Sequence, residues 1–237
     1  MNMKDKLTVH GGGMMASAIR VTANLVGAVF AAGVSNSGET DDLKYAREQN
    51  DLRSFIEHNR DNRIIYFSSY VARDGRSLYA QHKRQMEALI AETANDFIVL
   101  RLPQVVGKTS NKTLISYLVN ALKTKEQIAI HKDAYRSLVD VTDVGRILAS
   151  FVGRNVTREV IAVGPLKPLW IVDIVKNIES ILQAKINFSL ISGGERQSGD
   201  LSRALELLEP CDPLFRESYQ YSVLEKYVPK LFGGCFD

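Results

Sequence analysis

Residues 63–101 read RIIYFSSYVARDGRSLYAQHKRQMEALIAETANDFIVLR. The apolar runs at 63–67 and 97–101 predict two buried strands, and residues 78–93 have the apolar spacing of a helix. Short buried strands joined by a helix are typical of a βαβ unit with parallel strands. This stretch therefore predicts an α/β fold with a doubly wound parallel sheet, in which ligands bind beyond the carboxyl ends of the strands.

The same alternation continues on both sides of this unit. Upstream, we expect strands at 7–10 and 28–32 and helices at about 14–24 and 41–58. Downstream, the less regular pattern predicts helices at 114–124, 171–182, 201–208 and 221–231, strands at 137–140, 160–163 and 186–191, and one more helix that ends near residue 152. The second half is thus expected to be mixed α/β structure.

The composition excludes several classes of function. The chain of 237 residues carries 30 Lys and Arg against 27 Asp and Glu, a net charge of +3. This near balance gives no general attraction to nucleic acid or to an anionic membrane, so we expect neither as a partner. No apolar segment suits a membrane span or a signal peptide, which favours a cytoplasmic protein. The histidines and cysteines lack metal-ligand spacing, so no metal site is expected.

Three consecutive glycines follow the first expected strand and precede a helix. At such a junction, Gly11, Gly12 and Gly13 let the backbone approach a pyrophosphate, which a helix N-terminus also favours. The pattern is incomplete, because Ala16 stands where the last glycine of G-x-G-x-x-G belongs and no acidic residue follows about 20 positions on. The turn predicts dinucleotide binding; the alternative is a glycine turn without a ligand.

A tyrosine and a lysine one helical turn apart, Tyr79 and Lys83, share a face of the helix expected at 78–93. A nearby ammonium group lowers the pKa of a tyrosine, which makes the phenol a usable general acid or base. Ser69 ends the preceding strand, where a hydroxyl can bond a substrate oxygen, and Ser68 is a rival for that role. Glycine turn, strand-end serine and Tyr/Lys pair follow the order expected of a nicotinamide enzyme.

Together, these motifs resemble the extended branch of the short-chain dehydrogenase/reductase superfamily, which contains nucleotide-sugar epimerases and dehydratases. Ala31-Ala32-Gly33 is similar to the family's turn after its fourth strand, Asn50 lies where its helix asparagine does, and Ser69, Tyr79 and Lys83 match its catalytic set. Two later segments also resemble family motifs: Arg101-Leu-Pro-Gln-Val-Val-Gly107 and Arg136-Ser-Leu-Val-Asp-Val-Thr-Asp-Val144.

The resemblance implies an NAD- or NADP-dependent epimerase, dehydratase or reductase acting on a nucleotide-linked sugar. Tyr79 would exchange a proton with the sugar, Lys83 would hold the nicotinamide ribose and acidify Tyr79, and Ser69 would orient the oxygen. The implied cofactor contacts are Gly11, Gly12, Gly13, Ala31, Ala32, Gly33, Ser68, Tyr79, Lys83 and Leu102. The implied substrate contacts are Ser35, Asn36, Gln104 and Arg136, with the Arg136 guanidinium on the diphosphate.

The chain departs from the family pattern in three places. Two strands and a helix that the family has before Ala31 are missing. The missing segment usually recognises the adenosine ribose, so the choice between NAD and NADP stays open. Gln104 replaces a family asparagine, and Asp140 replaces a histidine.

From these features, we expect a Rossmann-like dinucleotide-binding domain at residues 1–165, shortened in its adenosine half, and a small substrate-side region at 166–237. The expected function is the enzyme described above. The alternative is a non-catalytic dinucleotide-binding sensor or partner protein of the same fold. Either function is compatible with a homodimer formed through the helices expected at 41–58 and 78–93.

Overall fold

The chain divides into two units in the computed structural model, which describes residues 6–109, 111 and 113–234. The first unit consists of residues up to Leu102, Val141–Val163 and Gly199–Glu209; the second consists of Pro103–Asp140, Gly164–Ser198 and the residues from Pro210 onward. This interleaved division differs from the single boundary expected near residue 165. It arises because the short helix α8 (Ser202–Leu207) packs on the first unit, where Arg203 pairs with Glu159.

The first unit is built on a sheet in the order β1-β2-β3-β4-β9, and every neighbouring pair of strands is parallel. Its strands are β1 (Leu7–His10), β2 (Gly27–Phe30), β3 (Ile64–Ser69), β4 (Phe97–Leu102) and β9 (Glu159–Ala162). β2 is buried throughout, whereas alternate residues of β1 are exposed. Within the described residues, β1 is the edge of the sheet, which agrees with the segment that is missing from the sequence.

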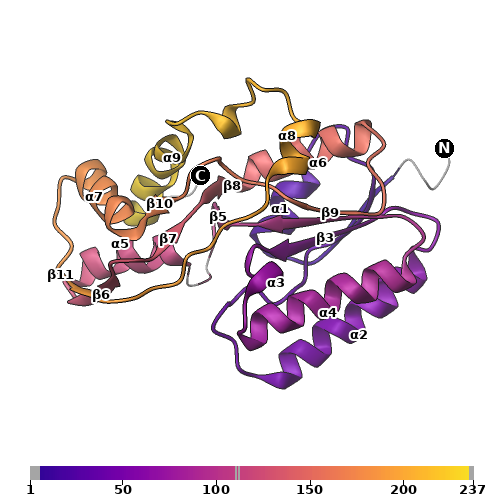
Figure 1. Cartoon of the computed structure of the whole chain (residues 1–237), viewed down its shortest axis with the longest axis horizontal. Helices are drawn as coiled ribbons and strands as arrows, with labels where there is room; N and C mark the ends of the chain where they lie inside the picture. The colour runs from indigo at the N-terminus through magenta and orange to yellow at the C-terminus, as the bar shows by residue number, and fades with distance from the viewer. Residues whose placement is uncertain (1–5, 110, 112, 235–237) are drawn as a thin grey trace. The chain divides into compact units, whose positions relative to one another are not determined.

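Helices cover both faces of this sheet, so the expected doubly wound fold is confirmed (Figure 1). One face carries α2 (Asp42–His58) and α4 (Leu78–Thr93), the other carries α1 (Met14–Arg20) and α6 (Val141–Gly153), and the short α3 (Val71–Asp74) precedes α4. Side chains cap the two longer helices. Asp41 accepts a hydrogen bond from the backbone N–H of Leu43, and Ser77 accepts one from that of Ala80. These caps fix where α2 and α4 begin.

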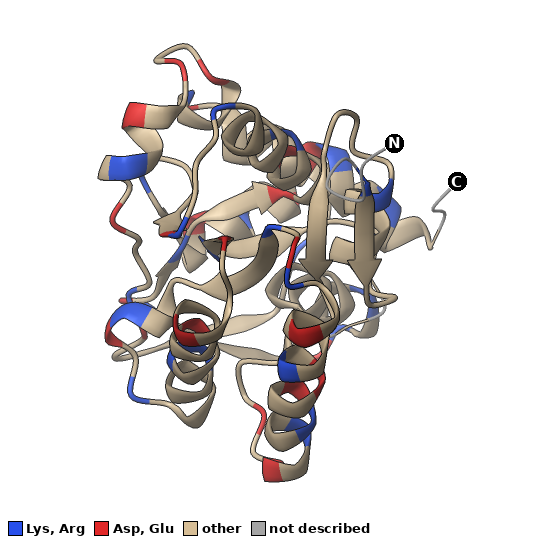
Figure 2. Ribbon diagram, turned by 90° about the vertical axis from the view of Figure 1, so that its right-hand side faces the viewer, with Lys and Arg blue, Asp and Glu red and all other residues tan. Residues whose placement is uncertain are grey.

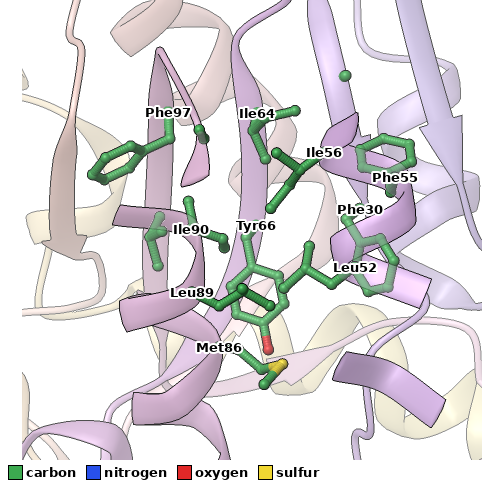
Figure 3. Close-up of a cluster of buried hydrophobic side chains, with 13 residues drawn as sticks. Phe30, Leu52, Phe55, Ile56, Ile64, Tyr66, Met86, Leu89, Ile90 and Phe97 are labelled. Carbon is green, nitrogen blue, oxygen red and sulfur yellow. The ribbon is translucent and has the colours of Figure 1, made fainter. Parts of the chain in front are cut away.

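A hydrophobic core of the first unit lies between α2, α4 and the sheet (Figure 3). Its larger side chains are Phe30, Leu52, Phe55, Ile56, Ile64, Tyr66, Met86, Leu89, Ile90 and Phe97. Tyr66 lies inside this cluster and is only 1% exposed. A phenol buried this deeply needs a hydrogen-bond partner within the protein. The side chain that supplies it belongs to the candidate active site.

Within its described residues, the second unit contains three two-stranded sheets and three longer helices. Its strand pairs are β5 (Gln104–Val106) with β8 (Leu138–Asp140), β6 (Ile128–His131) with β11 (Phe188–Ile191), and β7 (Tyr135–Arg136) with β10 (Leu169–Trp170). The helices are α5 (Leu114–Thr124), α7 (Ile171–Leu182) and α9 (Tyr219–Gly233), and a 3-10 turn lies at Pro213–Phe215. α9 packs against both α5 and α7, and this packing forms the centre of the unit.

A buried carboxylate connects α9 to β8. Asp140 Oδ2 lies 2.6 Å from Lys226 Nζ, and Oδ1 accepts a hydrogen bond from the Tyr227 hydroxyl at 2.8 Å. The backbone N–H of Asp140 donates to the Tyr219 hydroxyl at 3.0 Å, and that of Leu138 donates to Gln220 Oε1 at 2.8 Å. Asp140 therefore binds α9, which gives a structural reason for an aspartate where the resembled family has histidine.

Most of the expected elements are confirmed, with shifts of one or two residues at their ends. The helix expected at 14–24 is shorter, because it ends at Arg20 and Asn24 has a positive φ of 59°. Acidic and basic residues are interspersed along α2 and α4, in keeping with the nearly balanced charge of the chain (Figure 2). In the described part of the chain, no helix has the length and apolar character needed to cross a membrane.

Candidate active site

Ser69, Tyr79 and Lys83 come together at the carboxyl end of β3, within the first unit. Ser69 is the last residue of β3, and its side chain is hydrogen-bonded to that of Tyr79. Tyr79 and Lys83 lie on the buried face of α4, because residues four apart on a helix share a face. The Lys83 ammonium lies 5.6 Å from the centroid of the Tyr79 ring. The three side chains form one cluster, and both Tyr79 and Lys83 are buried.

A fourth member of this cluster, Glu48 on α2, accepts hydrogen bonds from four donors. Its Oε1 accepts from the Tyr66 hydroxyl at 2.6 Å and from Lys83 Nζ at 3.0 Å. Its Oε2 accepts from the backbone N–H of Val34 at 2.6 Å and from His82 Nε2 at 2.8 Å. Because a carboxylate can only accept, Nε2 of His82 carries a proton. Glu48 is fully buried, and these donors replace the water that the ion has lost.

The turn after β2 leaves room for this ion pair. A Cβ atom on Gly33 would lie 2.6 Å from Glu48 Oε1 and 3.0 Å from Lys83 Nζ, so a larger residue would collide with the pair. Lys83 Nζ also donates to the Tyr66 hydroxyl at 2.8 Å. Asn50, the residue matched to the family's helix asparagine, is exposed instead. The polar residue that α2 contributes to the site is therefore Glu48, which the sequence motifs did not indicate.

Burial and the charge of Glu48 make the Tyr79 phenol less acidic than the sequence predicts. Burial raises the pKa of Tyr79 above its ordinary value, the charge of Glu48 raises it further, and the hydrogen bond with Ser69 lowers it. The ammonium of Lys83, which the sequence predicts to acidify Tyr79, is paired with the Glu48 carboxylate at 3.0 Å. Burial lowers the pKa of Lys83, although Glu48 opposes this. Burial alone would raise the pKa of Glu48, but the hydrogen bond from His82 and the charge of Lys83 help to lower it to about 2.

Ser68, the rival hydroxyl, has a different partner. It donates to Glu87 Oε1 at 2.5 Å, and Arg101 binds the same carboxylate through Nε at 2.9 Å and Nη2 at 2.6 Å. Ser68 is buried, and its side chain points to the opposite side of β3 from that of Ser69, as alternate strand residues do. Of the two serines, only Ser69 is hydrogen-bonded to Tyr79.

The three glycines of this turn differ in their surroundings: the first is packed closely against the backbone, and the other two have free space around them. Gly11 has a φ of 124°, and a Cβ there would lie 2.5 Å from the carbonyl oxygen of Ala31. This close approach joins the ends of β1 and β2, where the backbone N–H of Ala31 donates to His10 at 2.8 Å. A Cβ on Gly12 or Gly13 would meet no atom within 4 Å. The fold thus requires Gly11, while Gly12 and Gly13 leave a backbone surface that a ligand can approach.

The remaining predicted contact residues lie in several places. Ser35 and Asn36 are exposed in the loop after the Gly33 turn, and Leu102 is buried at the end of β4. Gln104 and Arg136 belong to the second unit, on β5 and β7.

Arg136 is held by an acidic residue of its own unit. Its guanidinium donates to the Glu195 backbone at 2.6 Å and to Glu195 Oε2 at 3.1 Å. Burial lowers the pKa of Arg136, and the charge of Glu195 opposes this. A diphosphate at this guanidinium would compete with the Glu195 carboxylate.

A cleft of about 230 Å³ lies in the first unit, at the carboxyl ends of β3, β4 and β9. It is lined by Tyr70, Arg73, Arg101, Val160, Ala162, Gly199, Asp200, Ser202 and Arg203. None of Ser69, Tyr79 and Lys83 lines it. Its arginines Arg101 and Arg203 are each bound to a glutamate, Glu87 and Glu159. The cleft is therefore a separate feature from the Tyr79 cluster.

Comparison with known proteins connects this geometry to a family. Residues 63–164 match the model of the NAD dependent epimerase/dehydratase family. No curated protein matches the chain by sequence. The matched segment includes β3, α4 and β4, and thus Ser69, Tyr79 and Lys83.

Several solved structures share the fold at low sequence identity. A UDP-N-acetylglucosamine 4-epimerase from Methanobrevibacter ruminantium M1, in complex with UDP-N-acetylmuramic acid, superposes with a TM-score of 0.76 at 15% identity, covering 99% of this chain and 100% of that one. RMD from Pseudomonas aeruginosa, complexed with NADPH, gives a TM-score of 0.76 at 14% identity over 97% and 99%. A dTDP-glucose 4,6-dehydratase from Bacillus anthracis, in complex with NAD, gives 0.65 at 17% identity over 85% and 71%.

The similarity to these structures establishes the fold. The family model matches the chain at the level of sequence, in its central segment. Residues 63–164 thus match the NAD dependent epimerase/dehydratase family model, and the whole chain has the Rossmann-like fold seen in solved nucleotide-sugar epimerases and dehydratases.

Proposed function

We propose that the protein is an NAD- or NADP-dependent epimerase, dehydratase or reductase that acts on a nucleotide-linked sugar, with Tyr79 as the residue that transfers protons. The observation that carries this proposal is the convergence of Ser69, Tyr79 and Lys83, in which Ser69 lowers the pKa of Tyr79 and the buried Lys83 ammonium lies 5.6 Å from the centroid of the Tyr79 ring. A phenol, a hydroxyl and an ammonium converge at the carboxyl end of a central parallel strand, where α/β folds bind their ligands.

The residues present fit one end of a dinucleotide better than the other. Gly12 and Gly13 expose backbone beside the carboxyl end of β1, as a pyrophosphate requires, and the Tyr79 cluster suits the nicotinamide end. At the adenosine end, β1 is the edge of the sheet within the described residues, so that part of a cofactor would have few protein contacts. The bound cofactor supplies hydride transfer, and the protein supplies position and proton transfer.

Each residue of the cluster has a defined task in this function. The Tyr79 phenol exchanges a proton with the substrate oxygen: it donates the proton when the substrate carbon gains a hydride and accepts it when that carbon loses one. Ser69 orients that phenol through their hydrogen bond. Burial around Tyr79 excludes water, which strengthens these interactions. Lys83 holds the nicotinamide ribose, and Gly11–Gly13 and the Ala31–Gly33 turn border the cofactor.

The proposed substrate class is supported by two solved structures of the same fold, one in complex with UDP-N-acetylmuramic acid and the other a dTDP-glucose 4,6-dehydratase. Ser35, Asn36, Gln104 and Arg136 are the proposed substrate contacts. The Arg136 guanidinium suits a diphosphate, which can replace Glu195 as its partner. A homodimer through α2 and α4 is part of the same proposal.

A specific observation favours a second candidate, a non-catalytic dinucleotide-binding sensor. Lys83 is already bound to Glu48 and Tyr66, and Tyr79 is only 8% exposed. A sensor needs neither an accessible phenol nor a free lysine. The two functions differ in one measurable respect, because only the enzyme requires the Tyr79 hydroxyl.

The first experiment measures cofactor binding by calorimetry with NAD and with NADP. A dinucleotide that binds the folded protein also raises its unfolding temperature. Gly12→Val should abolish binding and leave the fold intact, because nothing lies within 4 Å of a Cβ at that position. Gly153→Val on α6 is the matched control, since a Cβ there also meets nothing, and it should bind normally. Unchanged binding by Gly12→Val would refute the assignment of the glycine turn.

The second experiment measures turnover with Tyr79→Phe, on a panel of UDP-, GDP- and dTDP-sugars. The change removes one oxygen and keeps the ring, so folding and cofactor binding should persist. Turnover should fall by about 10²–10⁴-fold, the usual contribution of general acid–base catalysis. Wild-type turnover in this variant would exclude the mechanism. Tight cofactor binding by the wild-type protein without turnover on any sugar would favour the sensor.

A further inference from the structure

The lysine of the Tyr79 cluster is held by a network that belongs to this chain's own residues. Lys83 Nζ donates to Glu48 Oε1 at 3.0 Å and to the Tyr66 hydroxyl at 2.8 Å, and the Tyr66 hydroxyl in turn donates to Glu48 Oε1 at 2.6 Å. All three side chains are at least 97% buried. This closed triangle fixes the ammonium in position on the side of Glu48 and Tyr66.

Glu48 has more hydrogen-bond partners than a carboxylate in a surface ion pair. Both of its oxygens accept two hydrogen bonds, which use the backbone N–H of Val34 and His82 Nε2 in addition to Tyr66 and Lys83. His82 occupies the position directly before Lys83 on α4, and its ring lies 4.5 Å from that of Tyr45 on α2. Two adjacent residues of α4 therefore bind the same carboxylate, which fixes the rotation of α4 against α2.

The polar and titratable groups around Tyr79 come from three elements. α2 contributes Tyr45 and Glu48, β3 contributes Tyr66 and Ser69, and α4 contributes His82 and Lys83. The negative charge of Glu87, also on α4, acts on Lys83 and Tyr66. Among these groups, Lys83 is the cation, and it is bonded directly to the anion Glu48.

We propose that Glu48 is a positioning residue that holds Lys83 against Tyr66 and cancels its charge where Lys83 would otherwise act on Tyr79. The inference rests on the proposed role of Tyr79 as the proton-transfer residue. Burial and the charge of Glu48 both raise the pKa of Tyr79, which is the direction this geometry requires. In the ligand-free protein, Tyr79 therefore holds its proton more firmly than an ordinary tyrosine does. Separation of Lys83 from Glu48, or loss of the Glu48 charge, would make Tyr79 more acidic.

The test follows the titration of Tyr79 itself in the protein without cofactor or substrate. Protein containing ¹³Cζ-tyrosine is titrated by NMR, and the Tyr79 signal is assigned as the one that Tyr79→Phe lacks. Glu48→Gln keeps the shape and removes the charge. Its Tyr79 signal should titrate about 1–3 pH units lower than in the wild type, the effect of removing a like charge and releasing a cation nearby. Asp140→Asn in the second unit is the control, and it should leave the Tyr79 titration unchanged.

Two outcomes would overturn the proposal: an unchanged Tyr79 titration in folded Glu48→Gln, or a shift of equal size in Asp140→Asn. If Glu48→Gln does not fold, Glu48→Asp decides, because it keeps the charge but withdraws the carboxylate from Lys83 by one methylene group. The Tyr79 titration should then fall by a smaller amount, and no change would again overturn the proposal. If the Tyr79 titration shifts in Glu48→Gln but the wild-type protein turns over no sugar, the proposed enzymatic function is rejected. The inference about Glu48 is then still supported.

Discussion

Glu48 in the first unit and Asp140 in the second are both buried carboxylates that bind a lysine and a tyrosine. Glu48 binds Lys83 at 3.0 Å and Tyr66 at 2.6 Å, and Asp140 binds Lys226 at 2.6 Å and Tyr227 at 2.8 Å. The lysines differ, because the side chain of Lys83 is 3% exposed and that of Lys226 is 44% exposed. A carboxylate, a lysine and a tyrosine are thus fully buried in the first unit, whereas the corresponding lysine in the second unit is partly exposed to solvent.

The difference in hydration decides what each cluster can do. Water around Lys226 screens its attraction to Asp140, so this pair mainly orients α9 on β8. Lys83 and Glu48 are both buried away from solvent, so their attraction is strong. Glu48 therefore affects where the Lys83 ammonium lies and how readily the nearby Tyr79 loses its proton. An ion pair thus affects neighbouring acid–base groups when both of its side chains are buried. When one side chain is exposed to solvent, the pair mainly attaches one element to another.

The largest predicted effect is the loss of stability in Lys83→Met. This change leaves Glu48 buried without its cation, and breaking a buried pair costs about 3–5 kcal/mol. We expect a loss of this size in urea unfolding at pH 7. The double variant Glu48→Gln with Lys83→Met removes both charges and should recover most of the loss. If the single variant is as stable as the wild type, Glu48 and Lys83 do not form the buried ion pair described here.

The sequence predicts the first unit well because its signals are local. The strands and helices of residues 63–101 have the apolar spacing of a βαβ unit, and Tyr79 and Lys83 are four residues apart on one helix. Strands as short as β7 and β10 have only two residues each, and their pairing depends on residues far apart in the chain. No periodicity can reveal a strand of that length.

Glu48 could not be predicted as a site residue because its partners come from separate segments. Val34 follows β2, Tyr66 lies in β3, and His82 and Lys83 lie in α4. One local signal was present: Glu48 lies in the buried stripe of α2 with Tyr45, Leu52, Phe55 and Ile56. A carboxylate in an apolar stripe requires a buried partner. The sequence could therefore have indicated a buried ion pair, though not with which lysine.

The second predicted effect is on the pH dependence of stability. Folding lowers the pKa of Glu48 from 4.5 to about 2, so the unfolded state binds more protons between these values. The stability that Glu48 contributes is fully present above about pH 5 and is lost as the pH falls through 2. Glu48→Gln lacks this contribution, so its deficit in unfolding free energy should shrink by up to about 3 kcal/mol between pH 6 and pH 2. A deficit that is independent of pH would contradict an ionised Glu48.

The smallest predicted effect is that of Lys226→Met, which removes the half-exposed cation of the Asp140 cluster. Asp140 keeps the Tyr227 hydroxyl, and solvent that already reaches Lys226 can hydrate the carboxylate in its place. We therefore expect a loss of about 0–1 kcal/mol in urea unfolding, and a smaller loss at high salt, because an exposed charge is screened. Tyr79 should titrate as in the wild type. A loss as large as that of Lys83→Met would mean that exposure of the lysine does not distinguish the two clusters, and the dryness of the Glu48 pair could then not explain its effect on Tyr79.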